Sequence, residues 1–509
     1  MTTTNNLTIL PEPRIEFGSD QYLHDPHDGL ALFGPYDASS ANHPKSIPYA
    51  VVGTAEGIAA FSEWSRIIQG AIIADPIRDA VGQRPLNEKL WAPYPGFEAA
   101  FSSTWPERPV STKELDPAAL STAARDLDPN KRAFDVVNSY LIAIEALMKR
   151  DERPTVIVCV VPEEVWKNCR PESRVIGGVG VEVSADERSK RRAGQEHFFE
   201  SFNPEQYRLS VDFRRQLKAR VMQHDVPVQI VRETTLRVTT APPKQRVRQL
   251  TPLPDRAWNL STALYYKAGA KPWRLAEARE GVCYIGIAFR KADRQGASAC
   301  CAAQMFLDTG DGIVFLGQDT PWYSEKERQF HLSRRSATRL LSGVLKTYRD
   351  WDGRPLKEIF LHYRSEISGD EFAGYRDACP PGVRLVGIRV RSERYAVRLF
   401  RPGHWPVLRG TFWKMSDRTA YLWASGFKPR WETYDGWEIP VPLRIDIQHG
   451  PADIEQVARD IFGLTKLNYN ACRLGNAEPV TIGFSDAVGE ILVANPTVPG
   501  KRPNFKFYI

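Results

Sequence analysis

The sequence predicts an α/β protein made of two successive sheet domains. In the first part of the chain, short apolar strands alternate with amphipathic helices, and the strand YAVVGT (49–54) leads directly into the helix IAAFSEWSRIIQGAI (58–72). The strand VIVCVV (156–161) is apolar at every position, which is typical of a parallel sheet covered by helices on both faces. We therefore expect a Rossmann-like open sheet with ligands at the carboxyl ends of its strands, followed by a different domain.

The second domain is predicted from a change of pattern after Trp273. Two long strands, GVCYIGIAFRK and ASACCAAQMFL, are bounded by turn signals, and Asp308-Thr-Gly-Asp-Gly marks a hairpin. A helix, the strand LKEIFLHYRSE, a second helix and the strand VRLVGIRV follow. Three antiparallel strands followed by helix, strand, helix and strand make the RNase H-like topology. Residues 1–274 are therefore assigned to an N-terminal segment and the Rossmann-like domain, and residues 275–509 to an RNase H-like domain.

Composition excludes several classes of protein. A chain of 509 residues is too long for one core, and 42% hydrophobic and 25% charged residues are ordinary for a globular protein. No apolar run reaches about 18 residues and no signal-peptide pattern opens the chain, so we expect a cytoplasmic protein without a membrane span. Seven cysteines without CxxC pairs predict neither disulfides nor a zinc site. The net charge of +7 permits a polyanionic partner without requiring one.

Three further segments carry specific expectations. The run LALF between Gly29 and Gly34 is expected to be a short strand closed by a turn. The charged stretch 173–205 is expected to be a surface insertion. Near the end of the chain, DIEQVARDIFGLTKLNYNA (453–471) reads as one helix.

Basic residues at helical spacing predict a binding site for a phosphate at the end of a nucleic acid strand. Arg214 and Lys218 lie four apart in a predicted helix, and Lys267 and Lys271 lie four apart at the end of another, so each pair shares a helix face. Gln229 lies in the strand VPVQIV between them. Such pairs are common on solvated helix faces, but these lack the acidic partners that usually accompany exposed lysines. Contact from several directions would fix the end of a strand.

The order of these residues also resembles the phosphate-binding signature of the MID domain of Argonaute proteins. A Rossmann-like domain followed by an RNase H-like domain resembles the MID–PIWI half of these proteins, without their N and PAZ domains. Segments spread over nearly the whole chain resemble short prokaryotic Argonautes: DGLALFGPYD, CRPES, FRRQLKAR, VPVQIVRETTL, YYKAGAKPW, CCAAQMFLDTGDG, LTKLNYNAC and FKFYI.

The resemblance implies a role for each of several residues. Arg214, Lys218, Gln229, Lys267 and Lys271 would contact the 5′-phosphate of a guide strand. The turn CRPES, through Cys169 and Arg170, would read or stack on the first base, and Lys466 and Asn468 would contact the guide backbone. A helix-end lysine is equally often structural. The carboxylate of Ile509 would reach the phosphate through a divalent cation, Mg²⁺, although the apolar end FKFYI is equally consistent with a sheet edge or a fraying end.

The resemblance also implies where a nuclease site would lie. Argonautes that cut a target hold two Mg²⁺ ions with four carboxylate or histidine ligands. Two of those positions are occupied here by Ala288 and Ser365, and Asp486 is retained, so no cleavage is expected. The alternative is that Glu366 or Asp370 supplies a missing carboxylate. Asp308, Asp311 and Asp319 are more consistent with capping a turn, and His362 with a hydrogen-bonded core histidine.

The function implied by the resemblance is that of a guide-binding subunit in a prokaryotic defence system. The chain would hold a short 5′-phosphorylated guide RNA and recognise complementary single-stranded DNA of plasmids or phage. It would then activate an associated TIR-APAZ protein, through a higher oligomer, and so deplete NAD. The alternatives are a guide-directed nuclease, a guide subunit for a sirtuin-type or nuclease APAZ effector, and a nucleic-acid-binding protein without an effector.

Overall fold

The computed structural model of the chain describes residues 6–74, 91–193, 202–238, 250–291, 299–307, 310, 312–317, 321–351, 353–436 and 438–509. Its first sheet has four parallel strands in the order β5-β4-β6-β7: β4 (Tyr49–Gly53), β5 (Ser111–Glu114), β6 (Val156–Val161) and β7 (Val228–Arg232). From β4 the chain passes to β5 on one side of it and then to β6 on its other side. The direction of the strand order therefore reverses between β4 and β6. Ligands of open parallel sheets bind outside the carboxyl ends of the strands.

Helices cover both faces of this sheet, as the apolar strand VIVCVV predicts. The helices of this part are α1 (Pro26–Phe33), α2 (Ala55–Ile67), α3 (Phe97–Phe101), α4 (Pro117–Ala124), α5 (Pro129–Met148), α6 (Glu163–Asn168), α7 (Ala185–Arg192), α8 (Pro204–Arg208), α9 (Phe213–Val221) and α10 (Leu253–Lys267). Val158 packs in a core with Trp64 of α2 and Leu264 of α10, whereas Cys159 packs in a second core with Leu217 of α9. Side chains alternate between faces along a strand, so a strand that is apolar throughout needs both covers.

The segment around LALF is a helix, and the expectation of a strand there is wrong. In α1 the Asp25 side chain accepts a hydrogen bond from the His27 amide, Pro26 takes the first helical position, and Gly34 ends the helix with a φ of 71°. An aspartate cap, a proline in the first turn and a glycine just past the end are helix-boundary signals. They outweigh the short apolar run that suggested a strand.

The second sheet has nine strands in the order β1-β16-β17-β18-β15-β14-β9-β10-β11. The strands are β1 (Leu7–Ile9), β9 (Val282–Lys291), β10 (Ala299–Leu307), β11 (Gly312–Leu316), β14 (Glu358–Tyr363), β15 (Arg384–Ser392), β16 (Thr411–Lys414), β17 (Thr419–Trp423) and β18 (Leu443–His449). Strands β9, β10 and β11 are antiparallel, and β14 and β15 run parallel to β9. Helices α11 (Arg334–Trp351) and α12 (Gly369–Ala378) pack on one face, and α14 (Val480–Val493) packs on β9 and β10. This arrangement confirms the RNase H-like prediction.

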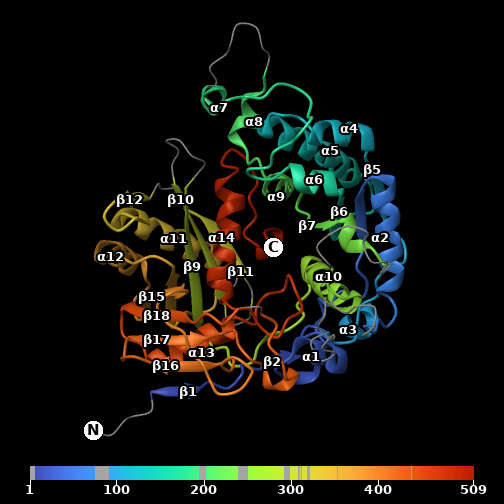
Figure 1. The fold of residues 1–509 in the computed structure, drawn as a ribbon. Coiled ribbons are helices and arrows are strands. Elements are labelled where there is room, and N and C mark those ends of the chain that lie inside the picture. The colour runs from blue at the N-terminus through green and yellow to red at the C-terminus, as the bar shows by residue number, and fades with distance from the viewer. Residues whose placement is uncertain are drawn as a thin grey trace, which may run out of the picture.

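The two ends of the chain connect the parts of the molecule. Leu7 in β1 pairs with Trp413, so the N-terminal segment adds the edge strand of the second sheet. Smaller elements are β2 (Ile15–Phe17), β3 (Gln21–Leu23), β8 (Arg274–Leu275), β12 (Trp322–Ser324) and β13 (Gln329–His331). The last residues, with the 3₁₀ turn η5 (Phe505–Phe507), lie centrally between the two sheets, beside α14 (Figure 1).

Three further sequence expectations can be compared with the described residues. Strands β10 and β11 form the expected hairpin, while Asp308, Asp311 and Asp319 lie outside the described residues. Helix α13 (Ile454–Leu464) ends at Leu464, so the predicted helix 453–471 is too long. None of the helices that the structure describes is long and apolar enough to span a membrane.

Candidate nucleic-acid interface

Two buried lysines lie where α9, β7, α10 and the end of the chain meet. The Lys218 ammonium on α9 donates hydrogen bonds to the main-chain oxygens of Tyr508 at 3.0 Å and Ile509 at 2.6 Å. The Lys267 ammonium, at the last residue of α10, donates to Oε1 of Gln229 on β7 at 2.6 Å. Both lysines are almost completely buried. We call Arg214, Lys218, Gln229 and Lys267 the basic socket.

The basic socket brings three cationic side chains together, and Lys218 donates to an oxygen of Ile509, the last residue. Burial, together with the charges of Arg214 and Lys267, holds the pKa of the Lys218 ammonium well below its ordinary value. Burial and the Arg214 charge lower the pKa of Lys267 to about 7. Within the described ranges, no side-chain carboxylate lies at ion-pair distance from Lys218 or Lys267. Buried cations are normally paired, so their convergence without an acidic side chain favours an anionic ligand.

Arg214 and Lys271, the other two predicted basic residues, differ in how the backbone positions them. Arg214, one helical turn before Lys218, is exposed at the mouth of the socket. Lys271 does not share a helix face with Lys267, because α10 ends at Lys267 and the chain turns at Gly269, whose φ is 101°. The Lys271 amide donates to Oδ2 of Asp37 at 2.8 Å. The position of Lys271 is therefore set by this turn and by Asp37, and not by the helical spacing from Lys267.

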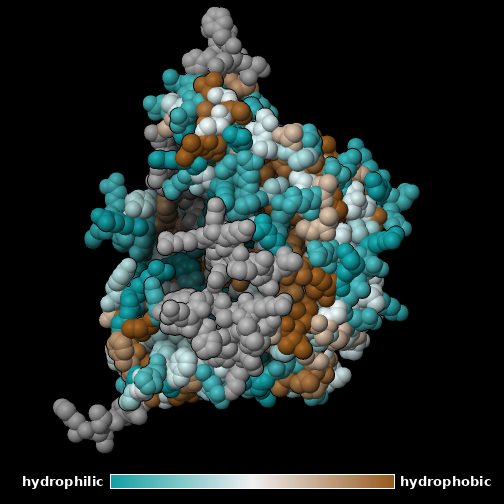
Figure 2. Space-filling view, turned by 45° about the vertical axis from the view of Figure 1, so that its right-hand side comes forward, coloured by the Kyte–Doolittle hydropathy of each residue, from teal (hydrophilic) through white to brown (hydrophobic). Residues whose placement is uncertain are grey.

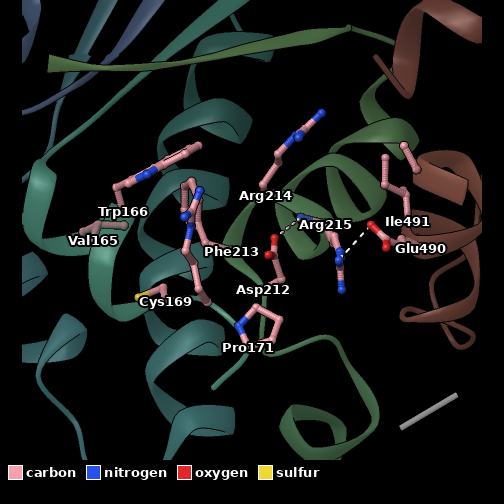
Figure 3. A pocket seen from close by; sticks show the side chains of 12 residues that line it. Val165, Trp166, Cys169, Pro171, Asp212, Phe213, Arg214, Arg215, Glu490 and Ile491 are labelled. Carbon is pink, nitrogen blue, oxygen red and sulfur yellow. Dashed lines mark hydrogen bonds and ion pairs between the residues drawn. The ribbon is translucent and has the colours of Figure 1, made fainter. Parts of the chain in front are cut away.

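A recess of about 290 Å³ adjoins the socket (Figure 3). It lies between α6 with the turn that follows it, the start of α9, and α14; its lining residues include Trp166, Cys169, Arg170, Asp212, Arg215 and Glu490. The Arg170 guanidinium lies 4.1 Å from the centre of the Trp166 ring. In Figure 3, Arg214 points away from Cys169 and Pro171. A planar ring and guanidinium at the edge of an open recess can stack on a nucleobase.

Sequence reasoning missed the residue that shapes the turn of this recess. Arg132 of α5 is buried, and its guanidinium donates to the main-chain oxygens of Asn168, Asp126 and Ser173. These contacts bracket the turn at both ends. A buried arginine that donates to three main-chain oxygens holds those parts of the backbone in fixed positions. In the sequence, Arg132 looks like any charged residue in the first turn of a helix.

Three contacts join α9 and the residue Ser210 before it to α14 and the residue Asn495 after it, and none of them was predicted. Arg215 forms an ion pair with Glu490 at 2.7 Å, drawn as a dashed line in Figure 3. The Asn495 side chain, just past α14, accepts from the Ser210 amide at 3.3 Å and donates to the Arg215 oxygen at 3.2 Å. Because α14 packs on β9 and β10, these contacts join the recess to the second sheet.

A cleft on the second sheet brings together the three residues at which the resemblance implies a nuclease site. Its lining includes Ala288 from β9, Ser365 just after β14, and Asp486 from α14, around a volume of about 290 Å³. Asp486 is the sole carboxylate residue of that lining in the part of the chain that the structure describes. Helix α14 approaches β9 so closely that a Cβ on Gly286 would lie 1.9 Å from the Thr481 oxygen.

An arginine fills the space beside Asp486, which sequence reasoning also missed. The Arg364 guanidinium forms two hydrogen bonds with Glu478, at 3.0 and 2.9 Å, and its Nε lies 3.3 Å from Oδ2 of Asp486. Glu366 is turned outward and pairs with Arg389 at 2.7 Å. Asp370 is exposed in the first turn of α12 and does not line the cleft.

Solved structures with the same architecture include three that contain Argonaute or Piwi proteins. Over 99% of its length, the chain matches Clostridium butyricum Argonaute bound to a guide DNA (5′ deoxycytidine) and a 19-mer target DNA, with a TM-score of 0.58, 13% identity and 54% of that chain covered. It matches Aa-Ago with externally bound siRNA (TM-score 0.54, 11% identity) and Drosophila Piwi (TM-score 0.58, 12% identity), each over 99% of this chain and 56% of the other. The chain has the MID–PIWI fold of Argonaute proteins.

The chain spans little more than half the length of these three proteins. No protein-family model matches the sequence, and no curated protein matches it either. In this fold, the four-stranded sheet belongs to the MID domain and the nine-stranded sheet to the PIWI domain. The recess and most of the basic socket are therefore MID features, whereas Ile509 and Glu490 reach them from the PIWI side.

The structure turns Lys466 away from the basic socket. Its ammonium is buried, pairs with Glu12 and donates to the His24 oxygen at 2.9 Å, so it is not exposed to a guide backbone. The expectation of a backbone contact from Lys466 is therefore wrong. Asn468 is half-buried and its Oδ1 accepts from the Asn470 amide at 3.0 Å, which stabilises the turn after α13.

Replacing Lys466 with methionine is expected to destabilise the fold. Burial lowers the pKa of Lys466 to about 8, and Glu12 opposes this effect, as expected for a desolvated ion pair. Without the Lys466 ammonium, the Glu12 carboxylate keeps only Arg409 as a cationic partner. Losing one partner of a buried ion pair lowers the free energy of unfolding by about 3 kcal/mol. Denaturant unfolding measures the loss, and discrimination between 5′-phosphate and 5′-hydroxyl guides should be unchanged. Lost discrimination with full stability would place Lys466 at the guide after all.

His362 of β14 is the buried core histidine that the sequence favours. Its Nδ1 lies 2.8 Å from Oγ1 of Thr481, and burial lowers its pKa to about 3, so the ring is neutral. Among the described residues, no group of three or more histidine, cysteine, aspartate or glutamate side chains could hold a metal ion.

Proposed function

We propose that this chain binds a short guide strand by its 5′-phosphate and uses the guide to recognise a complementary strand. The observation that carries the proposal is the pair of buried ammonium groups, Lys218 and Lys267, without an acidic side chain as partner, at the junction of MID, PIWI and the end of the chain. A phosphate dianion would supply counter-charge in addition to the Ile509 oxygen bonded to Lys218, with Arg214 at the mouth and the Gln229 amide beside it. Lys271 is proposed as a fifth contact.

The recess beside the socket is proposed as the site of the first guide base. Trp166 and Arg170 offer a planar surface, and the turn that carries Cys169 is held by Arg132. Stacking on an aromatic ring accepts every base, since each base has a π-face. The protein would then read the end of the guide and its backbone, and base pairing would supply sequence specificity.

Mg²⁺ is proposed as a cofactor at the 5′-phosphate. The Ile509 oxygen bonded to Lys218 is a hard oxygen ligand beside the socket, and Mg²⁺ is usually bound by one or two carboxylates together with substrate phosphates. The Ile509 carboxylate would be the ligand that this chain supplies to the cation. When bound, the ion would neutralise phosphate charge. Lys218 would then share its hydrogen bonds between the end of the chain and the phosphate.

We propose that the chain does not cleave the paired strand. Ala288 and Ser365 offer no carboxylate, and a cleft with Asp486 alone lacks the ligands for two hydrated cations. Changing Asp486 to alanine should therefore leave guide affinity within about two-fold of wild type, and a matched target should remain intact with Mg²⁺ or Mn²⁺ in both proteins. Cleavage of the target by the wild-type chain that disappears in Asp486→Ala would contradict the proposal.

The biological setting proposed here is a cytoplasmic prokaryotic defence system with a second protein. The guide would be RNA, the target single-stranded DNA of plasmids or phage, and the partner a TIR-APAZ protein that depletes NAD within a higher oligomer. The support is the resemblance of the sequence to short Argonautes. The face in Figure 2 is mostly hydrophilic but carries a contiguous hydrophobic patch, a feature often found at protein–protein contacts.

The experiment that tests this function is purification of the chain together with its genomic neighbour, followed by sequencing of the bound nucleic acid. Short RNAs with 5′-phosphates, and NAD hydrolysis that starts when complementary single-stranded DNA is added, are the expected results. A sirtuin-type or nuclease activity would identify a different effector. Absence of bound nucleic acid, or fragments of random length with 5′-hydroxyl ends, would contradict guide binding.

A further inference from the structure

An aspartate of the N-terminal segment holds the backbone of Lys271 through both its amide and its oxygen. Oδ2 of Asp37 accepts a hydrogen bond from the Lys271 amide at 2.8 Å, and the Asp37 amide donates to the Lys271 main-chain oxygen at 3.4 Å. The Tyr36 amide donates to the Pro272 oxygen at 3.0 Å. Asp37 and Lys271 are 234 positions apart, so this pairing joins the N-terminal segment to the turn after α10.

The other oxygen of the same carboxylate is bonded to the helix that carries Lys267. The Tyr265 hydroxyl on α10 donates to Oδ1 of Asp37 at 2.5 Å. Burial, together with the Asp37 charge, raises the pKa of the Tyr265 hydroxyl, so this group stays protonated and is the donor. Tyr265 precedes Lys267 by two residues in α10. One carboxylate therefore connects the turn of Lys271 with the helix of Lys267.

A histidine keeps this carboxylate in place. Nδ1 of His43 lies 3.5 Å from Oδ1 of Asp37 and 3.1 Å from the Tyr265 hydroxyl. Nε2 of His43 lies 2.8 Å from the main-chain oxygen of Ser102, which fixes the ring from its other side. The Asp37 side chain is only 15% exposed. A largely buried carboxylate with hydrogen bonds on both oxygens is held in one orientation.

We propose that Asp37 is a positioning residue of the guide-binding site, and that the N-terminal segment is therefore part of that site. Helix α10 ends at Lys267 and the chain turns at Gly269, so contacts outside the helix set where Lys271 lies. By holding the Lys271 backbone to α10, Asp37 directs the Lys271 ammonium to the phosphate that Lys267 binds. A flexible lysine that starts from a fixed backbone loses less freedom on binding. This inference rests on the proposed guide function.

The test is a double-mutant cycle on guide affinity, with fluorescent guides of one sequence that carry a 5′-phosphate or a 5′-hydroxyl. Lys271→Ala and Asp37→Ala are each expected to weaken binding of the phosphorylated guide by about ten-fold, with little change for the 5′-hydroxyl guide. Because Asp37 acts through Lys271, the double variant should also be about ten-fold weaker than wild type, whereas independent effects would multiply to about a hundred-fold.

Asp116→Ala is the matched control. Asp116 also accepts a hydrogen bond from a main-chain amide, that of Ala118 at the start of α4, at 3.0 Å. Its replacement removes a carboxylate of the same kind from the same domain, and it should leave the affinities for both guides as in wild type.

Three outcomes overturn the inference: multiplied effects in the double variant, equal losses for both guides in Asp37→Ala, or an unchanged phosphate preference in Lys271→Ala. A wild-type chain that does not prefer the phosphorylated guide contradicts the proposed function itself. If Asp37→Ala does not fold, Tyr265→Phe replaces it, since that change removes only the hydroxyl that holds the carboxylate. A loss of about three-fold or more that vanishes in the Lys271→Ala background supports the proposal, and equal losses in both backgrounds, or none, overturn it.

Discussion

Replacing both Lys218 and Lys267 with methionine is expected to abolish the preference for a guide with a 5′-phosphate. Each ammonium lies in the basic socket without an acidic side chain as partner, and a charge-assisted hydrogen bond contributes about 1.5–3 kcal/mol. Since about 1.4 kcal/mol is a factor of ten, the double variant should lose at least about a hundred-fold in affinity for the phosphorylated guide. Competition between 5′-phosphate and 5′-hydroxyl guides of one sequence measures this loss.

Methionine is chosen because it keeps an unbranched stem of similar length in a buried site. Affinity for the 5′-hydroxyl guide should change little, which separates a lost phosphate contact from a lost fold. Lys113→Met is the matched control, because Lys113 is exposed on β5 and its replacement should leave the binding of both guides as in wild type. If the double variant still prefers the phosphorylated guide, the socket lies elsewhere in the molecule.

Affinity for the phosphorylated guide is also expected to fall as the pH rises above neutrality. The pKa of Lys267 is about 7 in the free protein because of burial and the charge of Arg214. A bound phosphate dianion favours the charged ammonium and returns the pKa toward its ordinary value of about 10.4. Between these two pKa values binding takes up a proton, so affinity should decrease by up to about ten-fold per pH unit from about pH 7 to pH 9.

The depressed pKa of Lys218 adds to this fall, and protonation of the phosphate, with a second pKa near 6, should weaken binding on the acid side. The best affinity is therefore expected slightly below or at neutral pH. Lys267→Arg is the informative variant, because a guanidinium stays charged throughout this range and the pH dependence should become shallower. A 5′-hydroxyl guide should show no comparable dependence. Equal slopes for wild type and for the Lys267→Arg variant would show that Lys267 does not titrate on binding.

Local structure followed from local sequence with few errors. The alternation of strand and helix, the apolar strand VIVCVV and the order of elements after Trp273 predicted both sheets, because side-chain periodicity within an element is set by backbone geometry. The main local error was α1, where a proline and an aspartate cap define a helix that an apolar run of four residues conceals.

The candidate site was predicted only in part. Residues within one helix were placed correctly, whereas residues beyond a helix end were not. Spacing within one helix fixed Arg214 and Lys218 on one face, and the structure keeps them near each other. For Lys267 and Lys271 the same spacing failed, because the helix ends between them. Lys466 was also misplaced, since a lysine near a helix end has the same sequence signature whether it faces solvent or pairs with Glu12.

The sequence by itself determined the fold class, the residue types of the socket and the absence of carboxylates at Ala288 and Ser365. Only the tertiary structure decided that Lys218 meets Ile509, that Arg132 holds the turn at Cys169, and that Arg364 faces Asp486. Lys218 and Ile509 are 291 positions apart. Contacts over such separations depend on how the two sheets and α14 pack together, and no periodicity within a single element encodes that packing.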